Sequence, residues 1–78
     1  GIRVYPNPVA NGILNLEVSR EPVNEIKVYH SNGTVLFKKS FDHFTGNSKI
    51  YLPNLPTGVY MVEVNGDRVT HKEKIIVQ

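Results

Sequence analysis

The pair Asn-Gly occurs three times in this chain, beside runs in which apolar and polar residues alternate: Asn11-Gly12, Asn32-Gly33 and Asn65-Gly66. These residue types readily adopt the positive φ angles of the tight type I′ turns that join antiparallel strands. Alternation with a period of two is typical of a strand with one buried face. The sequence therefore predicts antiparallel strands, with a type I′ hairpin at Asn32-Gly33 and a second hairpin at Asn65-Gly66.

The choice of apolar residues favours the same fold class. Val and Ile together number 17, against 5 Leu, and Ala10 is the only alanine. β-Branched side chains lose rotamer freedom in helices but pack well on a pleated sheet. Ala and Leu, the strongest apolar helix formers, are the scarce residues here. Because no segment shows a sustained helical period either, the chain is predicted to be all-β.

About seven short strands are expected. They cover residues 2–5, 13–18, 25–29, 34–39, 49–52, 59–64 and 68–77. Pro6-Asn7-Pro8 ends the first strand, and residues 41–48 are expected to form an irregular loop. Antiparallel strands with one buried face pack best as two sheets face to face. The chain of 78 residues is thus predicted to be one domain, residues 1–78, folded as a small immunoglobulin-like antiparallel β-sandwich.

Several function classes are disfavoured. The formal net charge is +2, without a dense basic run, so we expect no nucleic-acid partner. The chain has no cysteine, and His30, His43 and His71 lack a second ligand at the spacing of a metal site. Ser40, Asp42 and His43 have the residue types of a catalytic triad but lie too close in sequence to form its geometry. We therefore expect no catalytic residue, metal or cofactor, and no enzyme.

Four motifs are spread along essentially the whole chain, from Val4 to Val77. They are Val4-Tyr5-Pro6-Asn7-Pro8, then Ile26-Lys27-Val28-Tyr29-His30-Ser31-Asn32-Gly33, then Leu52-Pro53-Asn54-Leu55-Pro56-Thr57-Gly58-Val59-Tyr60-Met61-Val62, and finally Lys74-Ile75-Ile76-Val77. In these motifs and in their order, the chain resembles the type A C-terminal sorting domain of the type IX secretion system of Bacteroidetes.

The resemblance implies that the domain is the address of a cargo protein fused N-terminally to it. Such a cargo crosses the inner membrane by an ordinary leader and passes through the periplasm. The outer-membrane type IX translocon and its shuttle protein then recognise the folded domain. A gingipain-like sortase removes it by cleavage just before the region 4–8, which leaves the cargo anchored on the outer-membrane surface or released. The chain is thus expected to be a ligand and substrate of these partners.

The residues expected to carry recognition stand in the motifs and the last strand. They are Pro6, Asn7, Pro8, Gly33, Gly58, Tyr60, Lys72, Lys74, Ile75, Ile76 and Val77. A final strand with basic and then apolar residues offers main-chain groups and side chains to a receptor groove. The structural alternative is that Ile75 and Val77 close the core while Lys74 and Ile76 point outward. Pro6, Asn7 and Pro8 likewise have a structural alternative, as a rigid entry to a strand. Gly33 and Gly58 can be turn residues without a contact role. Tyr60 can be an aromatic residue of the core.

Two rival functions fit a small β-sandwich. A carbohydrate-binding module needs several aromatic side chains on one exposed face; Tyr5, Tyr29, Tyr51 and Tyr60 are available, but Trp is absent. An immunoglobulin-like spacer leaves the motif at the chain end unexplained. If the last strand lies at a sheet edge, it can also pair weakly with a second copy of the chain.

Overall fold

The computed structural model describes residues 1–78 and contains five β-strands and no helix. The strands are β1 (Ile2–Tyr5), β2 (Ile13–Tyr29), β3 (Val35–Tyr51), β4 (Gly58–Asn65) and β5 (Thr70–Val77). They form one antiparallel sheet in the order β1-β2-β4-β5, with β3 paired to β2. The prediction of an all-β antiparallel domain is confirmed.

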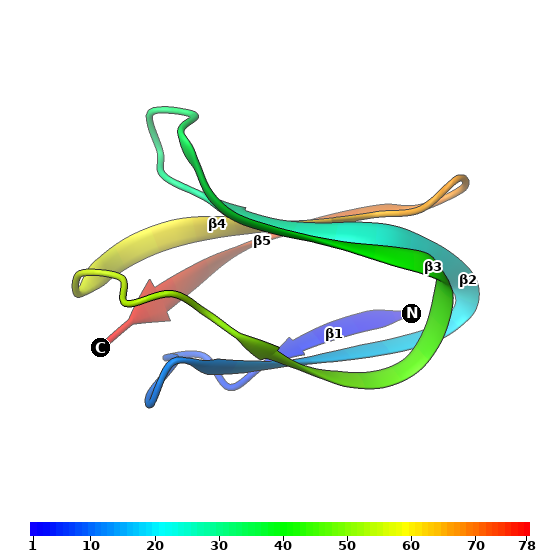
Figure 1. The fold of residues 1–78 in the computed structure, drawn as a ribbon, viewed down its shortest axis with the longest axis horizontal. Helices are drawn as coiled ribbons and strands as arrows, with labels where there is room; N and C mark the ends of the chain where they lie inside the picture. The colour runs from blue at the N-terminus through cyan, green and yellow to red at the C-terminus, as the bar shows by residue number, and fades with distance from the viewer.

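The sheet folds into two layers because β2 and β3 bend together through a corner (Figure 1). In the lower layer, the first half of β2 pairs with β1 and with the second half of β3. In the upper layer, the second half of β2 lies between β4 and the first half of β3, and β5 flanks β4. At the corner, Arg20 and His43 have φ angles of 75° and 46°, and the register shifts between Val18 and Val23. Bulges of this kind bend a strand and increase its twist.

The prediction of seven separate strands is wrong, because the structure has five. The predicted immunoglobulin-like sandwich of two sheets is not confirmed either, because the five strands form one sheet that bends into two layers. β2 joins the predicted strands 13–18 and 25–29, and β3 joins 34–39 to 49–52 through residues 41–48, which were expected to form a loop. Pro22 is tolerated within β2 because residues 20–22 have no partner in any ladder, so no bond is lost. The turn signals in these two places mark corners of continuous strands rather than strand ends.

Both predicted hairpins are confirmed, but the β2–β3 turn is not the predicted type I′ turn. In the β2–β3 turn only Gly33 has a positive φ, of 94°. Its N–H donates to the carbonyl of His30, and the N–H of His30 donates to the carbonyl of Thr34, both at 2.8 Å. This is a three-residue loop that ends in a left-handed glycine. The β4–β5 turn is longer and spans residues 66–69, closed by a bond from Gly66 N–H to the carbonyl of Val69.

The core lies between the two layers and consists of fourteen buried residues, all of them hydrophobic. β2 supplies six of them and β4 three, in the alternation expected of strands with one buried face. β3 is as long as β2 but contributes only Ile50. β3 is therefore the long strand that is least embedded in the domain.

Candidate recognition site

Most of the predicted recognition residues gather at one end of the molecule, on the left in Figure 1. The loop between β1 and β2, the β2–β3 turn, the loop before β4 and the end of β5 meet there. Lys72 is the exception, because it lies further back along β5. The fold thus brings the first and last motifs of the sequence together.

Asn7 joins the two ends of the chain. Its Nδ2 donates to the carbonyl of Lys74 at 3.0 Å, and its Oδ1 accepts a bond from the N–H of Ile76 at 2.9 Å. A carboxamide carries one donor group and one acceptor, as a peptide group does. The Asn7 side chain therefore takes the place of a neighbouring strand beside β5. Pro6 and Pro8 flank it with fixed φ angles and no N–H groups that need partners.

Val9 continues this contact with main-chain bonds. Its N–H donates to the carbonyl of Ile76 at 2.7 Å, and its carbonyl accepts a bond from Gln78 N–H at 3.1 Å. Val9 also forms a parallel bridge with Val77 and is only 1% exposed. Val9 lies outside the strands and motifs expected from the sequence. The local sequence offers only one β-branched residue directly after Pro-Asn-Pro, and a single such residue does not predict a strand.

The end of β5 is consequently not a free sheet edge. Residues 7–9 occupy the outward main-chain groups from Lys74 to Gln78. The outer edge of β5 is unpaired only nearer its start, around Thr70 and Lys72. The expectation that the last strand offers an open edge to a receptor or a second copy is therefore wrong for residues 74–78.

The side chains of the last strand alternate between core and surface. Ile75 is fully buried and Val77 is 7% exposed, whereas Lys74 is exposed and Ile76 is 42% exposed. This confirms the arrangement in which Ile75 and Val77 close the core while Lys74 and Ile76 point outward. A partner can therefore contact only the second pair without unfolding the domain.

Tyr60 is an aromatic residue of the core, which agrees with the structural alternative to a recognition role. It is 5% exposed, and its hydroxyl donates to the carbonyl of Pro56 at 2.6 Å. The centroids of the Tyr60 and His30 rings lie 6.1 Å apart, and the two ring planes meet at 79°. Gly58 opens β4 opposite Val77, so Gly58 and Tyr60 fix the loop before β4 and the end of β5 in one place.

The outer face of the upper layer carries a cluster of apolar side chains at this end, which we call the terminal apolar patch. It consists of Tyr29, Val35, Val59, Met61 and Ile76. Val59 and Ile76 are cross-strand neighbours, exposed to 51% and 42%, and Val35 is 49% exposed. Lys74 lies opposite Met61 at the edge of the patch and makes no ion pair within the chain.

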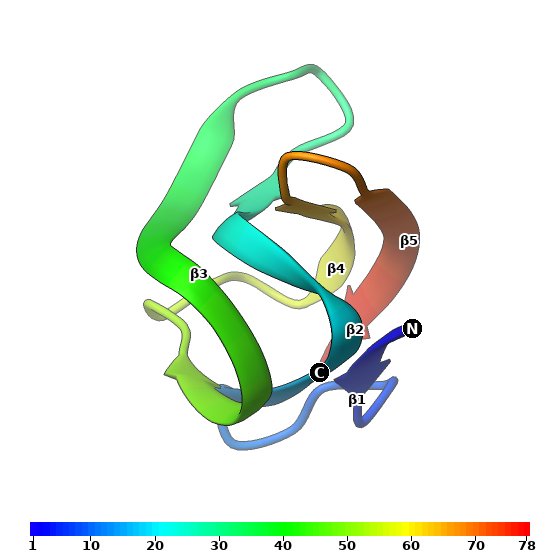
Figure 2. The same ribbon diagram turned by 90° about the vertical axis from the view of Figure 1, so that its right-hand side faces the viewer.

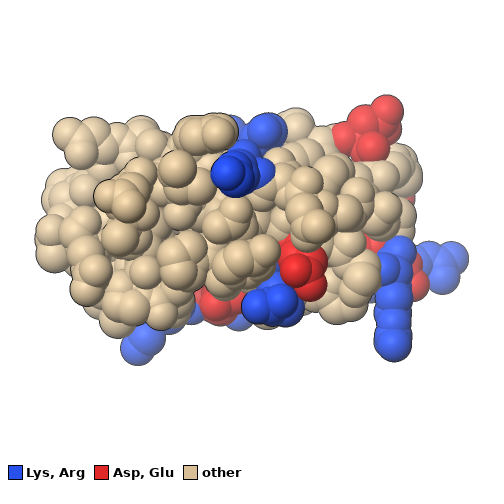
Figure 3. All heavy atoms as spheres, turned by 90° about the horizontal axis from the view of Figure 1, so that it is seen from below, with Lys and Arg blue, Asp and Glu red and all other residues tan.

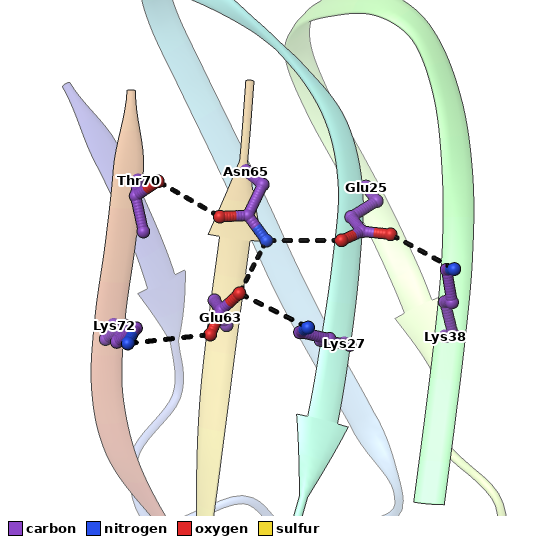
Figure 4. A network of polar contacts seen from close by, with 7 residues as sticks. All are labelled: Glu25, Lys27, Lys38, Glu63, Asn65, Thr70 and Lys72. Atoms are coloured by element: carbon purple, nitrogen blue, oxygen red, sulfur yellow. Dashed lines mark hydrogen bonds and ion pairs between the residues drawn. The ribbon is translucent and has the colours of Figure 1, made fainter. Parts of the chain in front are cut away.

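Further along the same face, polar side chains form a network across four strands (Figure 4). Its members are Glu25, Lys27, Lys38, Glu63, Asn65, Thr70 and Lys72. Glu63 is at the centre: it lies 3.4 Å from Nζ of Lys27 and 3.8 Å from that of Lys72. Lys72 is therefore part of a structural network on the sheet face.

Electrostatics within the network stabilise the ionised form of Glu63. The hydrogen bond that Asn65 donates to it, at 2.7 Å, is the main reason that the pKa of Glu63 lies below its usual value. Partial burial acts in the opposite direction, and the ammonium groups of Lys27 and Lys72 reinforce the lowering of the pKa.

The outer face of the lower layer carries few charges over much of its area (Figure 3). Tyr5 and Tyr51 lie on this face, 36% and 68% exposed. Tyr29 lies on the other layer and Tyr60 in the core. The four tyrosines therefore do not form the aromatic platform that a carbohydrate-binding module requires.

The residues considered for catalysis or metal binding do not assemble into a site. Asp42 and His43 are neighbours at 3.4 Å on the exposed corner of β3, where His43 also approaches Asp67 at 3.6 Å. Ser40 makes no hydrogen bond with either of them. No three His, Asp or Glu side chains are arranged to hold a metal ion. The chain also has no helix that could cross a lipid bilayer.

The structure is a small β-domain in which hydrogen bonds join the first and last motifs at one end. A family model described as a secretion system C-terminal sorting domain matches residues 3–78. The chain belongs to this family, the C-terminal sorting domains of the type IX secretion system, which confirms the resemblance noted in its sequence. No curated protein matches the chain.

Proposed function

We propose that the terminal end of this domain is read by the type IX translocon and its shuttle protein, and that a gingipain-like sortase removes the domain at the cell surface. Membership of the family already implies export to the cell surface or the extracellular space. The observation that supports the proposal best is the pair of bonds by which Asn7 holds Lys74 and Ile76. These bonds hold the first and last motifs together at one end of the domain, and a receptor can recognise the shape of this end.

The groups available to such a receptor are the terminal apolar patch and the unpaired ammonium of Lys74. Exposed apolar area contributes to affinity, and a single charge contributes to orientation. Passage through the periplasm and cleavage before residues 4–8 are further parts of this proposal.

A fusion experiment tests it. The chain is attached to the C-terminus of a periplasmic reporter in a type IX-competent bacterium, and surface-exposed and periplasmic reporter are quantified. We expect the natural sequence to bring the reporter to the surface and the double variant Lys74→Glu, Ile76→Thr to leave it in the periplasm. These two changes are sharper than deletion of residues 74–78, which also removes Ile75 and Val77 from the core.

Tyr51→Ser is the matched control, because it removes an exposed apolar side chain from the opposite layer. Its fusion should be exported as the natural one is. Normal export of the double variant contradicts reading of the terminal patch, and failure of the natural fusion contradicts the sorting function itself.

A further inference from the structure

β3 has a free edge along its whole length. It pairs with β2 on one side and with no strand on the other. Figure 2 shows β3 at the side of the molecule opposite β5. The two other edges are less available, because β1 has only four residues and residues 7–9 cover the end of β5. Unpaired N–H and C=O groups along a strand are a template for another strand.

The apolar side chains under this edge are incompletely covered. All three phenylalanines of the chain, Phe37, Phe41 and Phe44, lie on β3. They pack against the core but remain half-exposed, and Phe41 and Phe44 stack with ring centroids 5.0 Å apart. A further strand beside β3 would cover them from the open side.

β3 also carries an excess of positive charge equal to that of the whole protein. It contains Lys38, Lys39 and Lys49 against Asp42, and the formal net charge of the chain is +2. Lys38 is paired with a glutamate, but Lys39 has no anionic partner and lies over the Phe41 ring, 5.5 Å from its centroid. The edge therefore complements a negatively charged neighbour.

The direction of the main-chain groups near these lysines follows from the β2–β3 turn. In an antiparallel ladder, successive residues bond alternately to one side and to the other. His30 N–H donates to the carbonyl of Thr34. Counted back from His30, the main-chain N–H and C=O groups of every second residue of β2 therefore point toward β3. Lys38 and Ser40 lie opposite the intervening residues. Their N–H and C=O groups consequently point away from β2, toward solvent.

From the free edge, the half-covered phenylalanines and the charge, we propose that β3 binds an extended acidic segment of another polypeptide by strand addition at residues 37–41. Apolar side chains of that segment cover Phe37 and Phe41 on one face of the sheet, and its carboxylates face Lys38 on the other face. A second copy of this chain fits less well, because antiparallel pairing of two β3 strands about this point sets lysine against lysine, and like charges opposite each other destabilise a sheet. This surface lies apart from the terminal end proposed above, and its test needs no secretion machinery.

The probe is a short capped peptide in which valine alternates with glutamate, titrated into the isotope-labelled chain and followed by amide chemical shifts. We expect saturable binding, with the largest shifts at Lys38 and Ser40. A peptide that alternates valine with lysine should bind about tenfold more weakly, since it loses the charge pairing. Absence of saturable binding of the glutamate peptide overturns the proposal.

Ser40→Pro removes the outward N–H at the edge without removing a bond to β2, and should weaken binding about tenfold. Ser40→Thr is the matched control, because it keeps the N–H, and should bind as the natural chain does. Should Ser40→Pro fail to fold, Lys38→Glu provides an independent test. This variant reverses the charge on the face of the carboxylates and should reverse the preference between the two peptides. Three outcomes would each overturn the acidic segment as the occupant: unchanged binding by a folded Ser40→Pro, an unchanged preference in Lys38→Glu, or dimers of the free chain that Ser40→Pro abolishes.

Discussion

At the scale of single residues, the side chain of Asn7 makes the hydrogen bonds to β5 that a neighbouring strand would otherwise make. Its one side chain satisfies a carbonyl and an N–H of β5 that lie 67 and 69 residues away in the chain. A typical hydrogen bond within a protein contributes about 0.5–1.5 kcal/mol net, and loss of this side chain removes two such bonds. Asn7 was identified from its motif, but nothing local in the sequence indicates a partner so distant.

We expect Asn7→Ala to lower the free energy of unfolding by about 1–3 kcal/mol, because the two bonds to β5 are lost. The amide of Ile76 should also exchange with deuterium faster. Urea unfolding and hydrogen exchange measure the two effects. Asn54→Ala, in an exposed loop where the side chain makes no hydrogen bond, is the control and should change stability little. Equal stability of the two variants would mean that the Asn7 bonds contribute nothing.

At the scale of the elements, the glycine of the β4–β5 turn is needed for a close approach. A Cβ atom placed on Gly66 would overlap the carbonyl oxygen of Pro22 at the corner of β2. The φ of Gly66 is not in the left-handed region, so contact rather than conformation requires glycine here. The turn is thereby packed against the bend that joins the two layers.

Gly66→Ala is accordingly expected to destabilise the domain by about 1–3 kcal/mol through overpacking. Gly58→Ala is the matched control: its Cβ would meet only ordinary contacts of 3.8 Å and 4.0 Å. That variant should be neutral or slightly stabilising, since alanine restricts the unfolded chain. Thermal unfolding of both variants compares them, and a Gly66→Ala domain as stable as the natural one contradicts the packing argument.

The polar network on the upper face makes stability depend on pH. The folded-state pKa of Glu63 is lowered, chiefly by the hydrogen bond from Asn65. Its contribution is therefore complete above the ordinary glutamate pKa and is lost as the pH falls through the lowered value. We expect Glu63→Gln to cost about 1 kcal/mol at neutral pH and to reduce the loss of stability in acid. Urea unfolding at several pH values measures the free energy of unfolding, with the exposed Glu21→Gln as the control. If the free energy of unfolding changes with pH in the same way for Glu63→Gln and the natural chain, the prediction is contradicted.

The elements also show what could be predicted from the sequence. The alternation of side chains in β4 and β5 placed Tyr60, Ile75 and Val77 correctly, because period two depends only on local pattern. The corners of β2 and β3 were missed for two reasons. Arg20 is not a residue type that favours a positive φ, and His43, which belongs to a type enriched there, stands in a polar stretch where a bent strand and a loop have the same local pattern. The contact of Val9 with β5 was missed because it depends on the whole fold.

At the scale of the whole molecule, neighbouring residues of β5 face opposite sides of the sheet, one in the core and one on the surface. Ile75 is buried and Ile76 is 42% exposed, although they are adjacent and chemically identical. A domain of this size has a free energy of unfolding of only about 4–12 kcal/mol, so loss of one core side chain is a large fraction of it. Substitutions at the two positions therefore allow the stability of the domain and the proposed recognition of its surface to be tested independently.

We expect Ile75→Ala to lower the free energy of unfolding by about 2–5 kcal/mol through the cavity that it leaves. Ile76→Thr keeps a β-branched side chain and should change stability by about 0.5 kcal/mol or less. If the translocon reads the terminal apolar patch, a reporter fused to the Ile76→Thr domain is exported poorly although the domain is folded. Urea unfolding of the purified variants and surface quantification of the fusions give the two readouts. Because Ile76 lies beside Val59 on the sheet face, Val59→Thr should reduce export in the same way, and normal export of both threonine variants would show that this face is not the one recognised.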